Sequence, residues 1–200
     1  MSTMVRRSVI ASLAVGWMLV LPAMAAAEVE TFHRFEAVAT ANYVVDTPCP
    51  DGSVARLRVT VIGGHEEESE SGTTVLDSDF VTVLIRGFDC EGNLVNDRGS
   101  GPAEFTFSPS LQTAAVAGTI TTRDERSVTV DVSWEGTGEL EVTNNVTTFP
   151  GFTGHFQGRR RDAVATGTVV VDGETLVDGS TSNAEIETLE DRNISTGAQG

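Results

Sequence analysis

Apolar and polar residues alternate along much of the chain after residue 27, and this alternation predicts β-strands. The clearest run covers residues 127–134. Because successive side chains of a strand point to opposite faces, its apolar positions share one face. We expect that face to lie in the protein core, and it consists of Val128, Val130, Val132 and Trp134.

A second alternating run begins shortly after Trp134. Gly136 and Gly138 lie between the two runs, as is typical of a turn, and Leu140 and Val142 supply the apolar positions of the second run. The two runs are therefore predicted to pair with each other as a β-hairpin.

Shorter runs predict the other strands, at residues 36–45, 54–62, 80–88, 104–108, 113–121, 162–171, 174–177 and 184–189. Run 80–88 is apolar on both faces, so we expect it to lie centrally in a sheet with cover on each side. Residues 63–72 and 148–158 are predicted to be loops, and Asp172 with Gly173 predicts a tight hairpin turn.

No segment after residue 27 shows the long apolar period of a helix. The predicted fold class is therefore all-β. We expect a single antiparallel β-sandwich or up-and-down barrel of about nine or ten strands.

The N-terminus has the pattern of a secretory signal peptide. Arg6 and Arg7 precede a mostly apolar run, and small residues then allow cleavage after Ala25 or Ala27. The apolar run is short for a membrane span, so a retained anchor is the weaker interpretation. We expect a signal peptide at 1–27, an all-β domain at 28–191, a polar tail at 192–200, and a secreted or periplasmic protein.

The chain is strongly acidic and contains no lysine. Removal of Arg6 and Arg7 takes its formal net charge from −16 to −18. Such a charge repels phosphate arrays, so nucleic acid and anionic membrane surfaces are not expected as partners. Stable membrane insertion is not expected either, because aromatic girdles are missing and the outer strand faces are charged.

The two cysteines, Cys49 and Cys90, are predicted to form a disulfide. If strands 36–45, 54–62 and 80–88 form an antiparallel meander, the first and third run the same way and both cysteines follow a strand end on one rim. An exported chain favours oxidation of such a pair. A reactive thiol pair is the less favoured alternative.

Three stretches resemble a loose set of uncharacterised exported bacterial all-β proteins. The resemblance covers roughly the second half of the chain after the signal peptide, in motifs typical of turns and strands: Ser108 to Leu111 with Ala114, Val132 to Gly138, and Arg159 to Thr168. It implies export and an all-β fold, and it implies no activity.

No catalytic, metal-binding or cofactor motif is recognisable. The three histidines, His33, His65 and His155, lie in separate segments without a second ligand at zinc-site spacing. His65 precedes three glutamates that could gather around a cation, although a solvated loop is the favoured interpretation. A G-x-S-x-G elbow is missing, and His155 is the histidine that we would test as a base.

A candidate ligand site combines aromatic rings with the basic cluster at 159–161. On a strand, Arg159 and Arg161 would share a face and could clamp a carboxylate or sulfate group. The alternative is that these arginines pair with the protein's own acids. The predicted ligand-binding residues are Phe152, His155, Phe156, Arg159 and Arg161.

The sequence therefore favours an exported, non-catalytic β-module with a binding or structural role at the cell envelope or outside the cell. Its partner would be an unknown protein or a small anionic or carbohydrate ligand, although a chain with few Tyr and Trp residues offers few platforms for sugar rings. The alternative is an extracellular hydrolase whose acidic catalytic residues the sequence does not identify.

Overall fold

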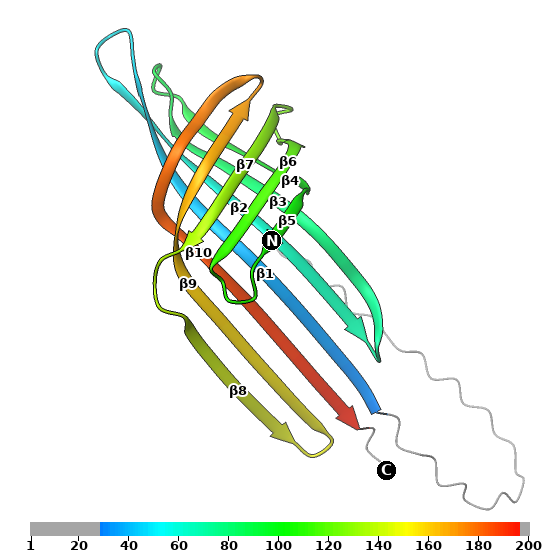
Figure 1. Ribbon diagram of the computed structural model, residues 1–200. Helices are drawn as coiled ribbons and strands as arrows, with labels where there is room; N and C mark the ends of the chain where they lie inside the picture. Colours follow the sequence, from blue (N-terminus) through cyan, green and yellow to red (C-terminus); the bar gives the residue numbers. More distant parts are fainter. Residues whose placement is uncertain (1–28, 197–200) are drawn as a thin grey trace, which may run out of the picture.

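The computed structural model describes residues 29–196, which form ten β-strands and no helix (Figure 1). The all-β prediction is confirmed. Residues 29–196 contain no helix with the length and hydropathy of a membrane-spanning segment, and the predicted signal peptide lies outside the described residues. The strands are β1 (Val29–Pro48), β2 (Val54–Glu70), β3 (Thr73–Phe88), β4 (Leu94–Pro102), β5 (Glu104–Phe107), β6 (Thr113–Thr121), β7 (Ser127–Gly136), β8 (Glu141–Phe149), β9 (Phe152–Val171) and β10 (Glu174–Thr196).

The ten strands form one antiparallel sheet in the order β4-β3-β2-β1-β10-β9-β7-β6-β5, with β8 paired to β9. The sheet curls until β4 meets β6, where Gly99 bridges to Thr122. A Cβ atom on Gly99 would lie 2.8 Å from the carbonyl oxygen of Thr121, so glycine permits this close approach. The curled part therefore resembles a closed barrel.

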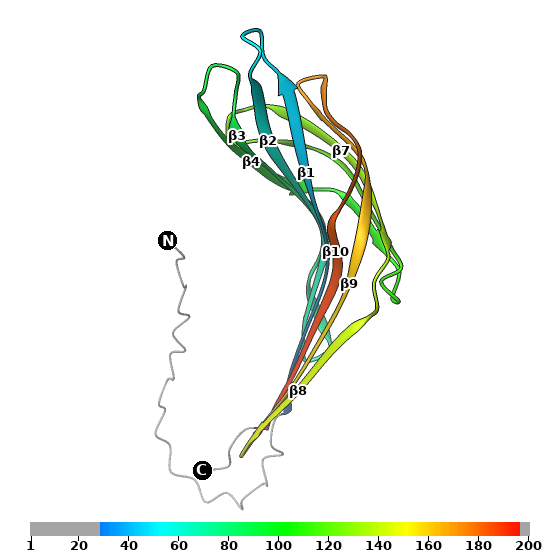
Figure 2. The ribbon, with the colours of Figure 1, turned by 90° about the vertical axis from the view of Figure 1, so that its left-hand side faces the viewer.

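The sheet has two parts that differ in cover. We call the curled part the barrel half, and its strands separate into two facing walls. Below it, the longest strands continue as a single layer (Figure 2). We call this lower part the extension, and it comprises residues 29–36, 65–79, 141–160 and 189–196. None of the side chains that the structure describes in these ranges is buried.

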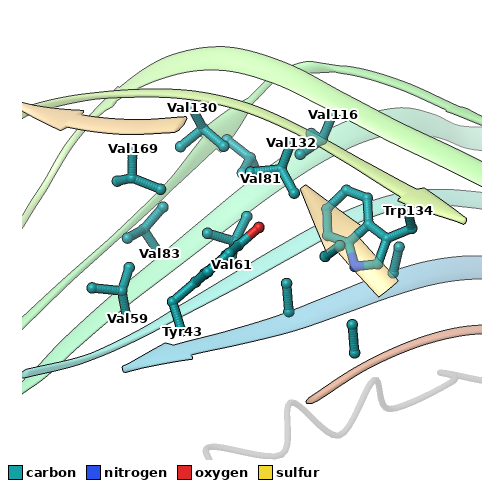
Figure 3. Close-up of a cluster of buried hydrophobic side chains, with 14 of the residues drawn as sticks. Tyr43, Val59, Val61, Val81, Val83, Val116, Val130, Val132, Trp134 and Val169 are labelled. Atoms are coloured by element: carbon teal, nitrogen blue, oxygen red, sulfur yellow. The ribbon is translucent and has the colours of Figure 1, made fainter. Parts of the chain in front are cut away.

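The core fills the inside of the barrel half and follows the predicted alternation. The four apolar residues of run 127–134 are all at most 2% exposed, as predicted. They meet the apolar faces of β1, β2 and β3 across the interior (Figure 3). The Trp134 ring also donates a hydrogen bond from Nε1 to the carbonyl oxygen of Thr40 at 2.9 Å. The largest aromatic residue of the core thus ties β7 to β1 as well as filling space.

Two predicted loops are strands in the structure, and both lie mostly in the extension. The segment 63–72 continues β2 to Glu70, and only Ser71 and Gly72 turn, with φ of 48° and 80°. The segment 148–158 contains the end of β8, a turn at Pro150 and Gly151, and the start of β9. Because the extension has no buried face, its strands carry polar residues on both sides and look like loops in the sequence.

The C-terminal strands are also longer than predicted. The runs 174–177 and 184–189 belong to one strand, β10, which tolerates two register shifts against β9. β10 continues to Thr196, into the segment that the sequence analysis assigns to a tail. The predicted turn at Asp172 and Gly173 is confirmed, with φ of 51° and 86°.

The predicted hairpin after Trp134 is wrong. β7 pairs with β6 and with the second half of β9, whereas β8 pairs with the first half of β9. The amide of Thr137 donates to the carbonyl oxygen of Asp162 at 2.9 Å, where the chain leaves the barrel half for the extension. Because β9 has twenty residues, its first half can pair with β8 and its second half with β7.

The prediction that both faces of run 80–88 are covered is also wrong. Val81, Val83 and Ile85 are buried, but Phe80 and Leu84 on the opposite face remain partly exposed. β3 has the same one-sided burial as its neighbours. It lies next to the edge strand β4 rather than in the middle of the sheet.

The predicted disulfide is confirmed. Cys49 and Cys90 are bonded, with their Cα atoms 5.4 Å apart, and no free cysteine remains among the described residues. The predicted meander that places them is also present, because β1, β2 and β3 are consecutive antiparallel neighbours. The bond joins the β1–β2 turn to the β3–β4 turn on one rim of the barrel half.

Candidate functional site

The face of the sheet that lines the barrel interior continues onto the extension. We call it the inner face, and the opposite side the outer face. In β1 the odd-numbered residues from Ala37 to Tyr43 are buried inside the barrel, so His33 and Phe35 further down the same strand belong to the inner face. The strand pairing carries this assignment to β2, β3, β10, β9 and β8.

Strand alternation divides the predicted ligand-binding residues between the two faces. His155, Arg159 and Arg161 lie on the inner face, because they pair through β10 with inner-face positions of β1. Phe152 and Phe156 lie on the outer face. The structure thus gives Arg159 and Arg161 a common face, as the sequence analysis expected, but it does not bring the two rings to them.

The three consecutive arginines have different partners. Arg160, on the outer face, forms an ion pair with Glu185 at 2.6 Å. Arg159 donates a hydrogen bond from Nη1 to the carbonyl oxygen of Pro109 at 2.8 Å. The side chain of Arg161 packs against Gly136, in the space that a Cβ atom on this glycine would occupy. The Nε atom of Arg161 is buried without a hydrogen-bond partner. Within residues 29–196, neither Arg159 nor Arg161 has a carboxylate within 4.0 Å, so the alternative of pairing with the protein's own acids holds for Arg160 alone.

A hollow of about 440 Å³ opens further along the extension, between β8, β9 and β10, and none of the three arginines lines it. Amide, imidazole, carboxylate and guanidinium groups gather there with a few apolar side chains. Its lining is Asn144, Asn145, Val146, His155, Phe156, Gln157, Glu190, Arg192 and Ile194.

Glu190 is the central charged group of this hollow. Its Oε1 accepts a hydrogen bond from the Nε atom of Arg192 at 2.7 Å and lies 3.1 Å from Nε2 of His33. Burial raises the pKa of Glu190, but the hydrogen bonds from His33 and Arg192 outweigh burial and hold the pKa below its ordinary value. The carboxylate is therefore ionised at neutral pH. His155 lies opposite Arg192 in the strand register, so two histidines flank one arginine.

His65 lies on the inner face of strand β2, where the barrel half meets the extension. The prediction of a solvated loop around it is therefore wrong. Its Nδ1 is 2.8 Å from Asp79, and its ring lies 6.2 Å from that of Phe35. Glu66 and Glu68 point to the outer face, where both meet Arg34. Adjacent carboxylates therefore do not converge on His65. Among residues 29–196 no group of three or more His, Cys, Asp or Glu side chains is placed to hold a metal ion.

The structure brings together residues that the sequence analysis missed. Glu190 and Arg192 were assigned to no site, and all three histidines prove to share the inner face. On the outer face of the barrel half, Arg58 lies directly opposite Arg86 beside a second hollow of about 440 Å³. Each of these sets comes from segments far apart in the sequence, so strand pairing was the missing information.

Comparisons with known proteins add little to this geometry. No family model and no curated protein matches the chain. Among solved structures, the chain is similar to the crystal structure of a candidate AttH protein from Nitrosomonas europaea, at 13% sequence identity and a TM-score of 0.25. The match covers 95% of this chain and 59% of that one, so this chain spans less than two thirds of its length.

Proposed function

We propose that the protein is an exported, non-catalytic module that binds a partner through the inner face, where the extension meets the barrel half. The observation that carries this proposal is the pair Arg159 and Arg161, which share a face in a strongly acidic protein without a carboxylate partner among the described residues. Guanidinium groups bind carboxylate and sulfate groups with two parallel hydrogen bonds. The ligand would be a small anion or an acidic carbohydrate, or a protein that displays such a group.

The hollow further along the extension supports this proposal. Asn144 and Gln157 offer amide donors and acceptors, while Val146 and Ile194 offer apolar contact. A few placed polar groups among apolar side chains are typical of ligand sites. The Cys49–Cys90 bond is compatible with an oxidising compartment, which supports a secreted or periplasmic location.

The test is binding of sulfated and carboxylated glycans, and of proteins from the cell envelope, to the purified chain. We expect Arg159→Gln with Arg161→Gln to reduce binding at least tenfold, because two charge-assisted contacts are lost. Arg160→Gln is the control from the same segment, since it removes one guanidinium from the outer face, whereas the double variant removes two from the inner face. Equal binding by the double variant and the wild type would show that the arginine pair is ordinary surface.

A second candidate, an extracellular hydrolase, is favoured by the contact between Glu190 and His33 and by His155 in the same hollow. A carboxylate and an imidazole near each other can share acid and base roles. A screen against polysaccharides, esters and peptides tests it. Turnover that disappears in Glu190→Gln or His155→Gln, with native Trp134 fluorescence retained, would favour hydrolysis over the binding module.

A further inference from the structure

Strand β8 forms a free edge of the extension. It pairs with β9 on one side, and no strand among residues 29–196 pairs with its other side. In Figure 1, β8 is the outermost strand of the lower sheet. All nine of its residues are exposed. Because alternate residues of an edge strand point their N–H and C=O groups away from the sheet, β8 offers a row of unused backbone partners.

This edge lacks the features that keep sheets from joining. Monomeric proteins protect long edges with charged residues, prolines or bulges. Between Val142 and Phe149 there is no charged residue and no proline, and the β8–β9 ladder has no register shift. The other edge of the extension, at residues 73–79, carries Asp77 and Asp79, and a bulge at Val75 interrupts this edge strand.

From Val142 to Phe149 the β8 edge is also uncharged, in a protein of formal net charge −16. Val142, Val146 and Phe149 are 50%, 59% and 61% exposed. No charged residue occurs from position 142 to position 158, which includes the whole β8–β9 turn. Elsewhere the negative charge opposes contact between two copies, but at this edge that repulsion is weakest.

We propose that two copies of the chain associate by antiparallel pairing of their β8 edges, about a two-fold axis perpendicular to the sheet at Asn145. Asn145 is the middle residue of β8, so this register pairs the strand along its whole length. Thr143 then lies opposite Thr147 of the second copy, and Glu141 lies opposite Phe149 rather than another acid. Threonine pairs are favourable across antiparallel strands, and like charges do not meet.

The second copy is the occupant that this edge fits best. An isologous contact needs a surface that is complementary to itself, and an uncharged run of Val, Thr and Asn residues meets that condition in both directions. The perpendicular axis keeps the inner faces of both copies on the same side. The two extensions would thereby form one continuous sheet, and this association does not depend on which ligand the inner face binds.

Light scattering and sedimentation of the full chain, with its disulfide intact, test this proposal. We compare two double variants. The double lysine variant combines Thr143→Lys and Thr147→Lys, which places positive charges opposite each other in the dimer. The charge-paired variant combines Thr143→Lys and Thr147→Glu, which places opposite charges there. Both positions oppose glycines of β9, Gly158 and Gly154, so the substitutions meet no opposing side chain within the hairpin.

We expect a wild-type dimer, an association at least about tenfold weaker in the double lysine variant, and wild-type association in the charge-paired variant. A change of tryptophan fluorescence on urea unfolding that matches the wild type shows that the barrel half of each variant is folded, because Trp134 is buried there. A monomeric wild-type chain would overturn the proposal, even if the edge paired with a strand of another protein. Equal association constants for the two variants would overturn it as well.

Discussion

At the scale of single residues, the interior of the barrel half contains a tyrosine hydroxyl that its packing does not satisfy. Tyr43 is 4% exposed, and its hydroxyl has no hydrogen-bond partner among the described residues. Burial raises the pKa of Tyr43 to about 12, because the ionised phenolate would lose its hydration. The ring contributes apolar contact, whereas the hydroxyl carries a desolvation cost.

Tyr43→Phe is therefore expected to stabilise the protein by about 1 kcal/mol at pH 7, since it removes an unsatisfied buried hydroxyl and keeps the ring. The wild-type protein should also lose stability between about pH 10 and pH 12, because the unfolded chain releases the tyrosine proton at its ordinary pKa while the folded chain retains it. Urea unfolding of both proteins across this range measures the two effects. A phenylalanine variant that is less stable, or that shows the same alkaline loss, would contradict this account.

Residue patterns predicted the barrel half well because each of its strands buries one face. Val128 to Trp134 alternates strictly for this reason, and Cys49 and Cys90 could be placed from the meander alone. The extension was predicted poorly, since Glu66 to Glu70 and Thr143 to Thr148 face water on both sides and have no period to detect. The opposition of Arg58 and Arg86 depends on register, which a single sequence does not reveal.

At the scale of elements, the barrel closes through a few contacts between β4 and the β6–β7 turn. Asp97 is 1% exposed, and its Oδ1 accepts hydrogen bonds from the amides of Arg98 at 2.8 Å and Asp124 at 3.3 Å. The amide of Arg123 donates to the carbonyl oxygen of Arg98 at 2.8 Å. One buried side chain thus joins two edges that share a single backbone bridge and a hydrogen bond from Arg123 to the carbonyl oxygen of Asn96.

Asp97→Ala is expected to lower the free energy of unfolding by about 2–3 kcal/mol, because two amides lose their acceptor where water has little access. Asp97→Asn keeps an oxygen at the same place and should cost clearly less. Urea denaturation of the three proteins provides the measurement. An alanine variant as stable as the wild type would mean that the contacts of Asp97 with the β6–β7 turn do not hold the barrel closed.

At the scale of the whole molecule, one strand can belong to two environments. In β3, Val81, Val83 and Ile85 are at most 1% exposed, whereas residues 73–79 form an edge of the single-layered extension. Backbone hydrogen bonds exposed to water open with little loss of apolar contact, so local stability should follow cover rather than strand identity.

Amide hydrogen exchange should therefore divide β3 into two parts. We expect the amides of residues 81–85 to exchange only through global unfolding, and those of residues 73–79 to exchange at least a hundredfold faster by local opening. The comparison is internal, because both segments share one strand and one sample. Uniform protection along β3 would indicate that the extension is covered in solution.

The continuity of β1, β2, β9 and β10 from the barrel half into the extension also determines how the protein would bear a mechanical load. Ladder hydrogen bonds run perpendicular to the strands, so a pull along the extension shears many of them together. A pull across the extension would instead break them one after another, beginning at an edge. A tether attached at the free end of the extension, along the strand direction, would therefore transmit tension directly into the disulfide-linked barrel half.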